Sequence, residues 1–231
     1  MSLKPVMQRH GIADLDALVA ALVTSNSRQL LDDTVDAMLN NETFFYREHS
    51  VFDDIANTAL EYIRQVNARQ RRITIWHCGV STGQEAYSMA MLLAEQDVKW
   101  AGWQIDVVGT DVSYHAIGRA RVGLYTQFEI QRGLPVQRMV RWFDQTDAGW
   151  LAKADLRRRI DFSVQNMLVD RPPLASSADL IFCRNLLLYF SLPMRQKAFA
   201  RLRAMAAPQS FLILGAGETV LGQTDQFVAS P

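Results

Sequence analysis

The stretch ITIWHCGVSTGQEAYSMAMLLAE, residues 73–95, decides the fold that we expect for this chain. It opens as an apolar strand, turns through Gly79 and Gly83, and continues as a helix that begins near Gln84. In an open α/β sheet, such a loop lies beyond the carboxyl end of a strand, where ligands bind. Glycines let the backbone approach a ligand without a Cβ clash, and the helix N-terminus offers free N–H groups. The stretch therefore predicts a ligand site at the end of the first strand.

Four more apolar runs follow and read as strands: WQIDVVGTD, RIDFSVQN, ADLIFCRN and SFLILGAG. Helical patterns lie between some of them, near residues 84–96, 113–121 and 193–206. Strands that alternate with helices indicate a mainly parallel sheet covered by helices, with right-handed crossovers. We expect the strand order 3-2-1-4-5, which makes the first and fourth strands neighbours.

Two other regions surround this α/β pattern. Residues 1–65 carry apolar residues at helical spacing, and Ser50 is a plausible N-cap for the last of these helices. The polar-aromatic block NNETFFYREHS interrupts the helical pattern. The link between the second and third strands is longer than one helix needs and contains the β-like pieces GLYTQF and GWLAK. We expect a small inserted β-subdomain there, at about residues 122–158.

The charges and the apolar pattern exclude several classes of protein. Lys+Arg and Asp+Glu balance at 24 each, whereas a nucleic-acid-binding protein normally shows a basic excess. The cluster RQRR, residues 69–72, is either a solvated helix end or a docking point for an acidic partner. No apolar run approaches the roughly 20 residues of a membrane span, and the start lacks a secretory signal. We therefore expect a cytoplasmic protein with no direct membrane insertion.

The cysteines and histidines do not predict a metal site. Cys78 and Cys183 form no CxxC pair, and the 4 histidines are scattered without ligand spacing. Both cysteines fall at the ends of strands that the predicted order makes neighbours. We expect them to be buried, reduced thiols.

The acid in the glycine loop indicates the kind of ligand. A dinucleotide site would show G-x-G-x-x-G, which is absent here, and Glu85 would repel a pyrophosphate. A carboxylate on the first helical turn suits a ligand with a cationic amino group and a sulfonium. Those are the charges at the methionine end of S-adenosylmethionine.

Polar residues end the next three strands. Asp111 ends the second strand and can accept hydrogen bonds from both hydroxyls of a ribose, or it can cap the following helix. Asn166 and Asn185 end the third and fourth strands, where each could bind a ligand or simply form a turn. Because these strand ends share one edge of the sheet, we favour a nucleoside site.

At this point the sequence resembles a known family. NETFFYR, IWHCGVSTGQEAYSMAMLLAE, GTDVSYHAIGRARVGLY, DFSVQNML and DLIFCRNLLLYFS are similar, in this order, to blocks of the CheR-type chemotaxis receptor methyltransferases. The resemblance runs from about residue 30 to about residue 227. It implies a class I methyltransferase fold, Rossmann-like, that moves the methyl group of S-adenosylmethionine to glutamate side chains on chemoreceptor cytoplasmic helices, as part of chemotaxis adaptation.

The resemblance also implies roles for individual residues. Matched by position, the cofactor contacts are Asn41, Thr43 and Arg47 in the block that closes over the cofactor, Gly79 and Gly83 in the loop, Glu85 at the methionine end, Asp111 at the ribose, Asn166 and Met167 at the adenine, and Asn185 and Leu186 after the fourth strand. Tyr189 matches the tyrosine that faces the transfer site. We predict that Arg47 and Tyr189 are the catalytic pair that positions the acceptor carboxylate.

The resemblance predicts the domain bounds of the chain. Some positions of this sequence differ from the family pattern. Residues 1–46 form a shortened N-terminal helical region with its linker, and residues 47–231 form the methyltransferase domain. The N-terminal region is acidic where the family is often basic, and Gln84 and Ala86 replace a common acid and a common proline. The family's C-terminal strands are expected to be missing from this sequence. The short loop FDQTDAGWLAK predicts a protein that does not depend on a receptor tether peptide.

A glutamate acceptor needs little chemical activation. Its carboxylate titrates near pH 4.3 and is already a nucleophile at neutral pH, so no strong general base is required. Catalysis can come from holding the reacting atoms in line. Two alternatives are a class I methyltransferase with another acceptor and a non-catalytic module that binds S-adenosylmethionine in signalling.

Overall fold

The computed structural model describes residues 3–229, and its centre is a parallel sheet. The 5-stranded sheet has the order β6-β2-β1-β7-β8, and every neighbouring pair is parallel. Its strands are β1 (Arg72–Cys78), β2 (Gln104–Asp111), β6 (Ile160–Val164), β7 (Ala178–Cys183) and β8 (Ala206–Leu214). This is the predicted order 3-2-1-4-5, so the fold class of a class I methyltransferase is confirmed.

The sheet separates two apolar cores. Ile73 and Ile75 of β1 pack on one face with α6 (Gln84–Glu95) and α7 (Tyr114–Val122). Trp76 faces the other way and packs with buried side chains of α11 (Leu192–Met205). Alternate residues of a strand point to opposite faces, and both faces of a parallel sheet are normally buried. Continuous apolar runs in the sequence are the consequence.

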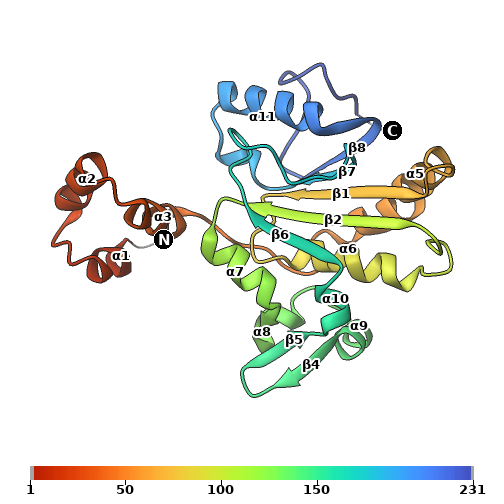
Figure 1. The fold of residues 1–231 in the computed structure, drawn as a ribbon, viewed down its shortest axis with the longest axis horizontal. Coiled ribbons are helices and arrows are strands. Elements are labelled where there is room, and N and C mark those ends of the chain that lie inside the picture. The colour runs from red at the N-terminus through yellow and green to blue at the C-terminus, as the bar shows by residue number, and fades with distance from the viewer. Residues whose placement is uncertain (1–2, 230–231) are drawn as a thin grey trace.

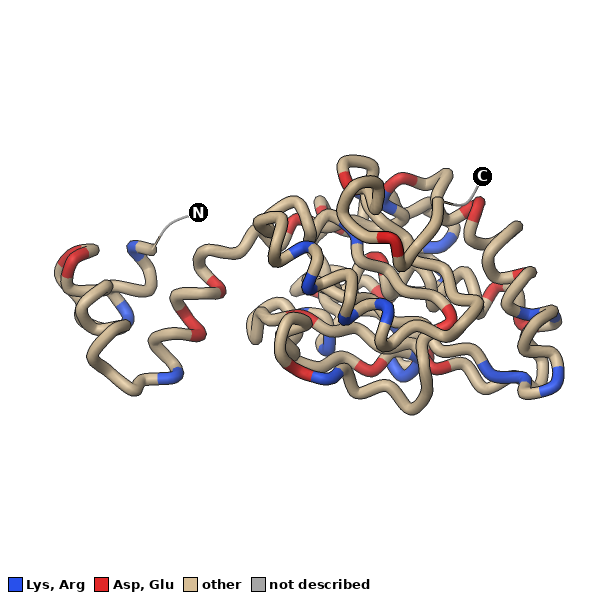
Figure 2. The backbone as a smooth tube through the Cα atoms, turned by 90° about the horizontal axis from the view of Figure 1, so that it is seen from above, with Lys and Arg blue, Asp and Glu red and all other residues tan. Residues whose placement is uncertain are grey.

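The first helices form a separate group at one end of the molecule (Figure 1). They are α1 (Lys4–Arg9), α2 (Leu15–Thr24) and α3 (Arg28–Met38), and they share a small core of their own. The group is tied to the sheet domain where Asp36 Oδ2 accepts a hydrogen bond from the backbone N–H of His115 (3.2 Å). Figure 2 shows acidic and basic residues interspersed along the chain. No helix within residues 3–229 has the length and apolar character that a membrane span requires.

The helical stretch before β1 starts earlier than predicted. It consists of α4 (His49–Asp54), a π-helical turn (Ile55–Ala59) and α5 (Leu60–Val66). Ser50 is not its N-cap: the cap position is Glu48, which has a left-handed φ of 57° and whose side chain makes no capping hydrogen bond. The prediction was wrong because Glu48 is held by a contact distant in sequence, described below.

The segment between α7 and β6 forms a second, 3-stranded antiparallel sheet of order β3-β5-β4. Its elements are β3 (Leu124–Tyr125), α8 (Gln127–Gln131), α9 (Val136–Trp142), β4 (Phe143–Thr146), β5 (Gly149–Ala152) and α10 (Ala154–Arg157). The inserted sheet packs against the NETFFYR block. The Phe45 ring packs edge-on against Tyr125 (5.0 Å) and Phe143 (5.5 Å). A Cβ at Gly133 would lie only 1.9 Å from the Phe45 carbonyl oxygen, so only glycine permits this approach.

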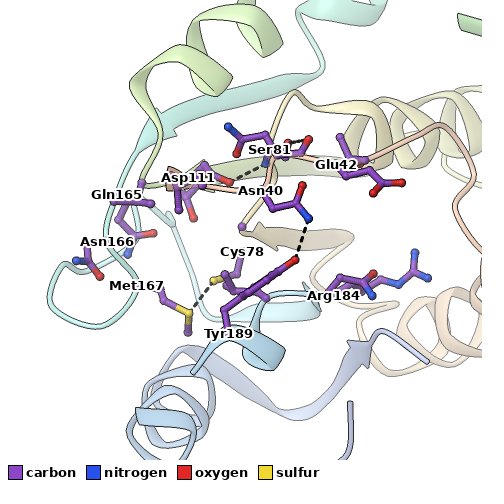
Figure 3. Close-up of a pocket in the computed structure, with 18 of the residues that line it drawn as sticks. Asn40, Glu42, Cys78, Ser81, Asp111, Gln165, Asn166, Met167, Arg184 and Tyr189 are labelled. Atoms are coloured by element: carbon purple, nitrogen blue, oxygen red, sulfur yellow. Dashed lines mark hydrogen bonds between the residues drawn. The ribbon is translucent and has the colours of Figure 1, made fainter. Parts of the chain in front are cut away.

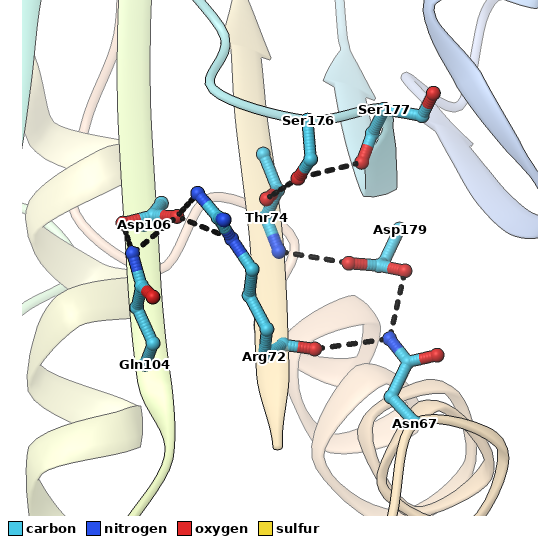
Figure 4. Close-up of polar contacts among 8 residues, drawn as sticks. All are labelled: Asn67, Arg72, Thr74, Gln104, Asp106, Ser176, Ser177 and Asp179. Atoms are coloured by element: carbon cyan, nitrogen blue, oxygen red, sulfur yellow. Dashed lines mark hydrogen bonds and ion pairs between the residues drawn. The ribbon is translucent and has the colours of Figure 1, made fainter. Parts of the chain in front are cut away.

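A polar network ties the amino ends of the strands together (Figure 4). Asp179 at the start of β7 accepts hydrogen bonds from Asn67 Nδ2 (2.9 Å) and from the Thr74 backbone N–H (2.8 Å). We expect Asp179→Ala to lower the free energy of unfolding by about 2 kcal/mol, because both donors lose a charged acceptor. Urea denaturation of Asp179→Ala beside Asp147→Ala, a control in the exposed β4–β5 turn, measures this. Equal stability of the two variants would contradict it.

Candidate active site

A cavity of about 320 Å³ opens where β1, β2, β6 and β7 end (Figure 3). Its lining comes from segment 38–47, from the loop after β1 and from the turns after β2, β6 and β7. Most of the residues predicted from the sequence line it: Asn41, Thr43, Arg47, Gly79, Glu85, Asp111, Asn166, Met167, Asn185, Leu186 and Tyr189. The structure therefore brings together residues spread over nearly 150 positions of the chain. They meet beyond the carboxyl ends of the strands, where open α/β sheets bind ligands.

Gly83 is the exception among the predicted cofactor contacts. It lies outside the cavity lining, at the N-cap of α6, with a φ of 94°. A Cβ there would lie 3.0 Å from the Ala120 Cβ and 3.2 Å from the Phe162 ring. Gly83 is therefore needed for close packing of α6 against α7 and β6. Gly79 does line the cavity, and a Cβ there would lie 3.0 Å from Leu186.

Asp111 has a fixed orientation at the cavity. Its Oδ2 accepts from the Ser81 backbone N–H (2.8 Å) and its Oδ1 from the Ser113 N–H (3.0 Å). Burial raises the pKa of this carboxyl, although the backbone hydrogen bonds oppose the shift. The cap of α7 is Ser113, whose side chain accepts from the Ala116 N–H, so Asp111 is not the capping residue. Each carboxylate oxygen keeps a lone pair for a ligand.

Glu85 lies deep in the cavity beside a buried arginine. The Arg184 side chain is 1% exposed and forms ion pairs with Glu85 and with Glu48 Oε2, the latter at 2.9 Å. Its Nη1 also donates to the Arg47 carbonyl oxygen (2.9 Å). Burial raises the pKa of Glu85, and the positive charges of Arg184 and Arg47 oppose that rise. Sequence reasoning missed Arg184, although a charged residue that ends an apolar strand is a signal, because burying it requires partners.

Arg47 and Tyr189 stand at the mouth of the cavity. Arg47 donates to the Glu42 carbonyl oxygen (3.2 Å), and among the described residues no carboxylate lies within ion-pair distance of it. Tyr189 is 62% exposed, and its hydroxyl accepts a hydrogen bond from Asn40 Nδ2 (3.1 Å). This bond crosses the mouth from segment 38–47 to the turn after β7 (Figure 3). Asn40 was not predicted, because it lies just before the NETFFYR block from which Asn41 was predicted.

Hydrogen bonds to Glu218 stabilise the turn after β7, and the sequence did not predict this residue. The Glu218 carboxylate accepts from the backbone N–H groups of Asn185 (2.8 Å), Leu187 (2.7 Å) and Gly215 (2.8 Å). Asn185 has a left-handed φ of 56°, and its Oδ1 is buried with no hydrogen-bond partner among the described residues. Because buried amides are normally paired, this oxygen is a candidate ligand contact.

The β6 end of the cavity is more apolar. Asn166 forms a turn, since its Oδ1 accepts from the Leu168 N–H (2.9 Å), while Asn166 also lines the cavity. Met167 is buried, and its sulfur lies 3.5 Å from the Cys78 sulfur. Cys78 and Cys183 are free and buried, as predicted, and the hydrogen bond with Cys78 raises the pKa of the Cys183 thiol. The carboxylates of Glu85 and Asp111 and the apolar side chain of Met167 line one cavity, and this combination fits a nucleoside joined to a cationic amino acid.

Comparison with known proteins identifies the family. Residues 41–231 match the CheR methyltransferase, SAM-binding domain. Chemotaxis protein methyltransferase 1 of Vibrio cholerae serotype O1 is 35% identical over 228 residues, which cover 97% of this chain and 82% of that protein. Chemotaxis protein methyltransferase Cher2 of Pseudomonas putida is 32% identical over 230 residues, with the same coverage. The shared domain and the shared sequence extend over nearly the whole chain, which therefore belongs to the CheR family of S-adenosylmethionine-dependent methyltransferases.

Proposed function

We propose that the protein transfers the methyl group of S-adenosylmethionine to glutamate side chains on the cytoplasmic helices of a chemoreceptor, and that it does so in the cytoplasm. The relatives named as chemotaxis protein methyltransferases support a role in chemotaxis. The environment of Arg47 is the observation that supports glutamate as the acceptor. Arg47 lines the same cavity as the exposed Tyr189, and its guanidinium has no carboxylate partner in the described chain. A carboxylate acceptor would satisfy both groups.

The lining of the cavity supports the proposed cofactor roles. Glu85 would hold the amino group of the methionine end, and Asp111 the two ribose hydroxyls, because both carboxylates line the same cavity. Asn166 and Met167 would hold the adenine at the more apolar end. Asn185 and Leu186 would contact the cofactor from the turn after β7, and Asn41 and Thr43 from the opposite segment. Gly79 would let the backbone approach the ligand.

The residues at the mouth would orient the acceptor. When bound, S-adenosylmethionine supplies an electrophilic methyl group on a sulfonium. An acceptor carboxylate is ionised at neutral pH, so this chain needs no base to remove a proton from it. Arg47 and Tyr189 would donate hydrogen bonds to one carboxylate oxygen and leave the other free to attack. Alignment of this kind supplies much of the acceleration in bimolecular transfers.

Methylation of receptor fragments tests the proposal. Purified cytoplasmic fragments of candidate receptors would be incubated with protein and methyl-labelled S-adenosylmethionine, and the label located by mass spectrometry. We expect base-labile methyl esters on glutamates, lost when those glutamates are changed to alanine. Label that survives mild base would indicate another acceptor. Tight binding of S-adenosylhomocysteine without transfer would indicate a non-catalytic module.

We also propose that the protein works without a receptor tether. The β4–β5 hairpin is closed by pairing of Thr146 with Gly149, which leaves a short turn at this edge of the inserted sheet. In the same assay, receptor fragments with and without a C-terminal NWETF pentapeptide should be methylated at equal rates. Faster methylation of the fragment that carries the peptide would contradict this.

A further inference from the structure

Arg184 joins two walls of the cofactor cavity. It follows β7 directly, and its guanidinium reaches both Glu85 in the first turn of α6 and Glu48 just before α4. The same guanidinium bonds the Arg47 carbonyl oxygen at 2.9 Å. One side chain therefore fastens segment 38–48, most of which lines the cavity, to the end of the parallel sheet.

The charges around Glu85 make Arg184 the main counter-ion. Burial favours the neutral acid, and the neighbouring Glu48 carboxylate works in the same direction. Arg184 and Arg47 are the cations that face Glu85, and only Arg184 contacts it. Without Arg184, a carboxyl group this deeply buried would take up a proton nearer neutral pH. A neutral Glu85 would attract an ammonium group far less than a carboxylate does.

Glu48 is the second contact of this arginine. Its φ of 57° is unusual for a residue other than glycine and is maintained by surrounding structure. The ion pair with Arg184 supplies part of that structure, because it holds the side chain of Glu48 toward the sheet. The entry to α4 and the catalytic candidate Arg47, one residue earlier, are thereby placed relative to the cavity.

We propose that Arg184 is a positioning residue, which keeps the Glu85 carboxylate charged and aimed at the amino group of the cofactor, and which fixes segment 38–48 above it. The proposal rests on the role proposed for Glu85 in cofactor binding. Arg184 acts through Glu85 and Glu48 and is not assigned a contact with the reacting atoms.

The pH dependence of cofactor binding tests the electrostatic part. The dissociation constant of S-adenosylhomocysteine would be measured by calorimetry between pH 6 and pH 9 for wild type and Arg184→Gln. We expect Arg184→Gln to bind about 30-fold more weakly at pH 7 and to regain affinity as the pH rises and Glu85 ionises. Wild-type affinity should be nearly constant over the same range. A loss of affinity that is equal at every pH, or no loss, would overturn the proposal.

A double-mutant cycle tests the role of Arg184 separately from the role of Glu85. Glu85→Gln alone should weaken binding, and Arg184→Gln should add less than about threefold in that background, because both changes remove one interaction. Additive effects would overturn the role of Arg184. Wild-type affinity in Glu85→Gln would instead remove the proposed function of Glu85 itself, and with it the inference.

Arg184→Lys keeps the test valid if the glutamine variant does not fold. Lysine retains the positive charge but cannot contact both carboxylates and the carbonyl oxygen. We expect Arg184→Lys to bind S-adenosylhomocysteine with a nearly constant affinity from pH 6 to pH 9. An affinity that falls on the acidic side of neutrality in this variant would show that charge at position 184 does not control Glu85, and would overturn the proposal.

Discussion

Replacing Arg47 by alanine is expected to lower the turnover number for methylation of a receptor fragment by about 100-fold, while the affinity for S-adenosylhomocysteine changes less than about fivefold. The guanidinium lines the cavity and, within residues 3–229, makes one hydrogen bond, to the Glu42 carbonyl oxygen. Its removal should therefore leave the cavity intact but let the acceptor carboxylate rotate away from the line of attack. Single-turnover rates at saturating cofactor measure the effect.

Two companion variants make this prediction specific. Tyr189→Phe removes only the hydroxyl bonded by Asn40, so we expect a smaller loss of turnover, about tenfold. Arg64→Ala is the control, because Arg64 pairs with Glu61 on α5, away from the cavity. Wild-type turnover in both Arg47→Ala and Tyr189→Phe, with intact folding, would disprove the assignment of the catalytic pair.

Asp111→Ala should weaken S-adenosylhomocysteine binding by about 100-fold, which corresponds to two hydrogen bonds to a charged acceptor. The Ser81 and Ser113 N–H groups hold the carboxylate in place before any ligand arrives, so the ribose hydroxyls would meet an oriented acceptor. Calorimetry gives the dissociation constant directly. Turnover at saturating cofactor should fall much less than affinity.

Asp106→Ala provides the matched control for this variant. Asp106 lies on the same strand as Asp111 but near its amino end, where it pairs with Arg72 (2.7 Å) outside the cavity. We expect unchanged affinity for S-adenosylhomocysteine in Asp106→Ala. An unchanged affinity in Asp111→Ala as well would refute the ribose role.

The sheet could be predicted from the sequence because its strands are buried on both faces. Each strand is then a short apolar run. Polar residues at or just after the ends of β2, β6 and β7 lie on one edge of the sheet: Asp111, Asn166 and Asn185. Local sequence patterns were less reliable where tertiary contacts determine the backbone conformation. Ser50 has the right chemistry for a cap, yet Glu48, turned by its ion pair with Arg184, precedes α4. Gly83 matches a ligand loop but is required for helix packing.

The residues that the sequence did not reveal share one property. Arg184, Glu218 and Asn40 act through partners far away in the chain, such as Glu85, the Asn185 backbone and Tyr189. A single sequence carries no record of such pairs. It can indicate that a buried charge needs a partner, but the partner becomes visible only when the strands are assembled.

The Asn40–Tyr189 hydrogen bond has a consequence for how spent cofactor leaves the enzyme. It joins side chains that are 149 positions apart in the chain and that both line the cavity. Every catalytic cycle must exchange product for fresh cofactor, and an exchange between these two residues requires the hydrogen bond to open. A solvent-exposed, uncharged bond contributes only about 1 kcal/mol, so thermal motion parts and remakes it far faster than typical turnover.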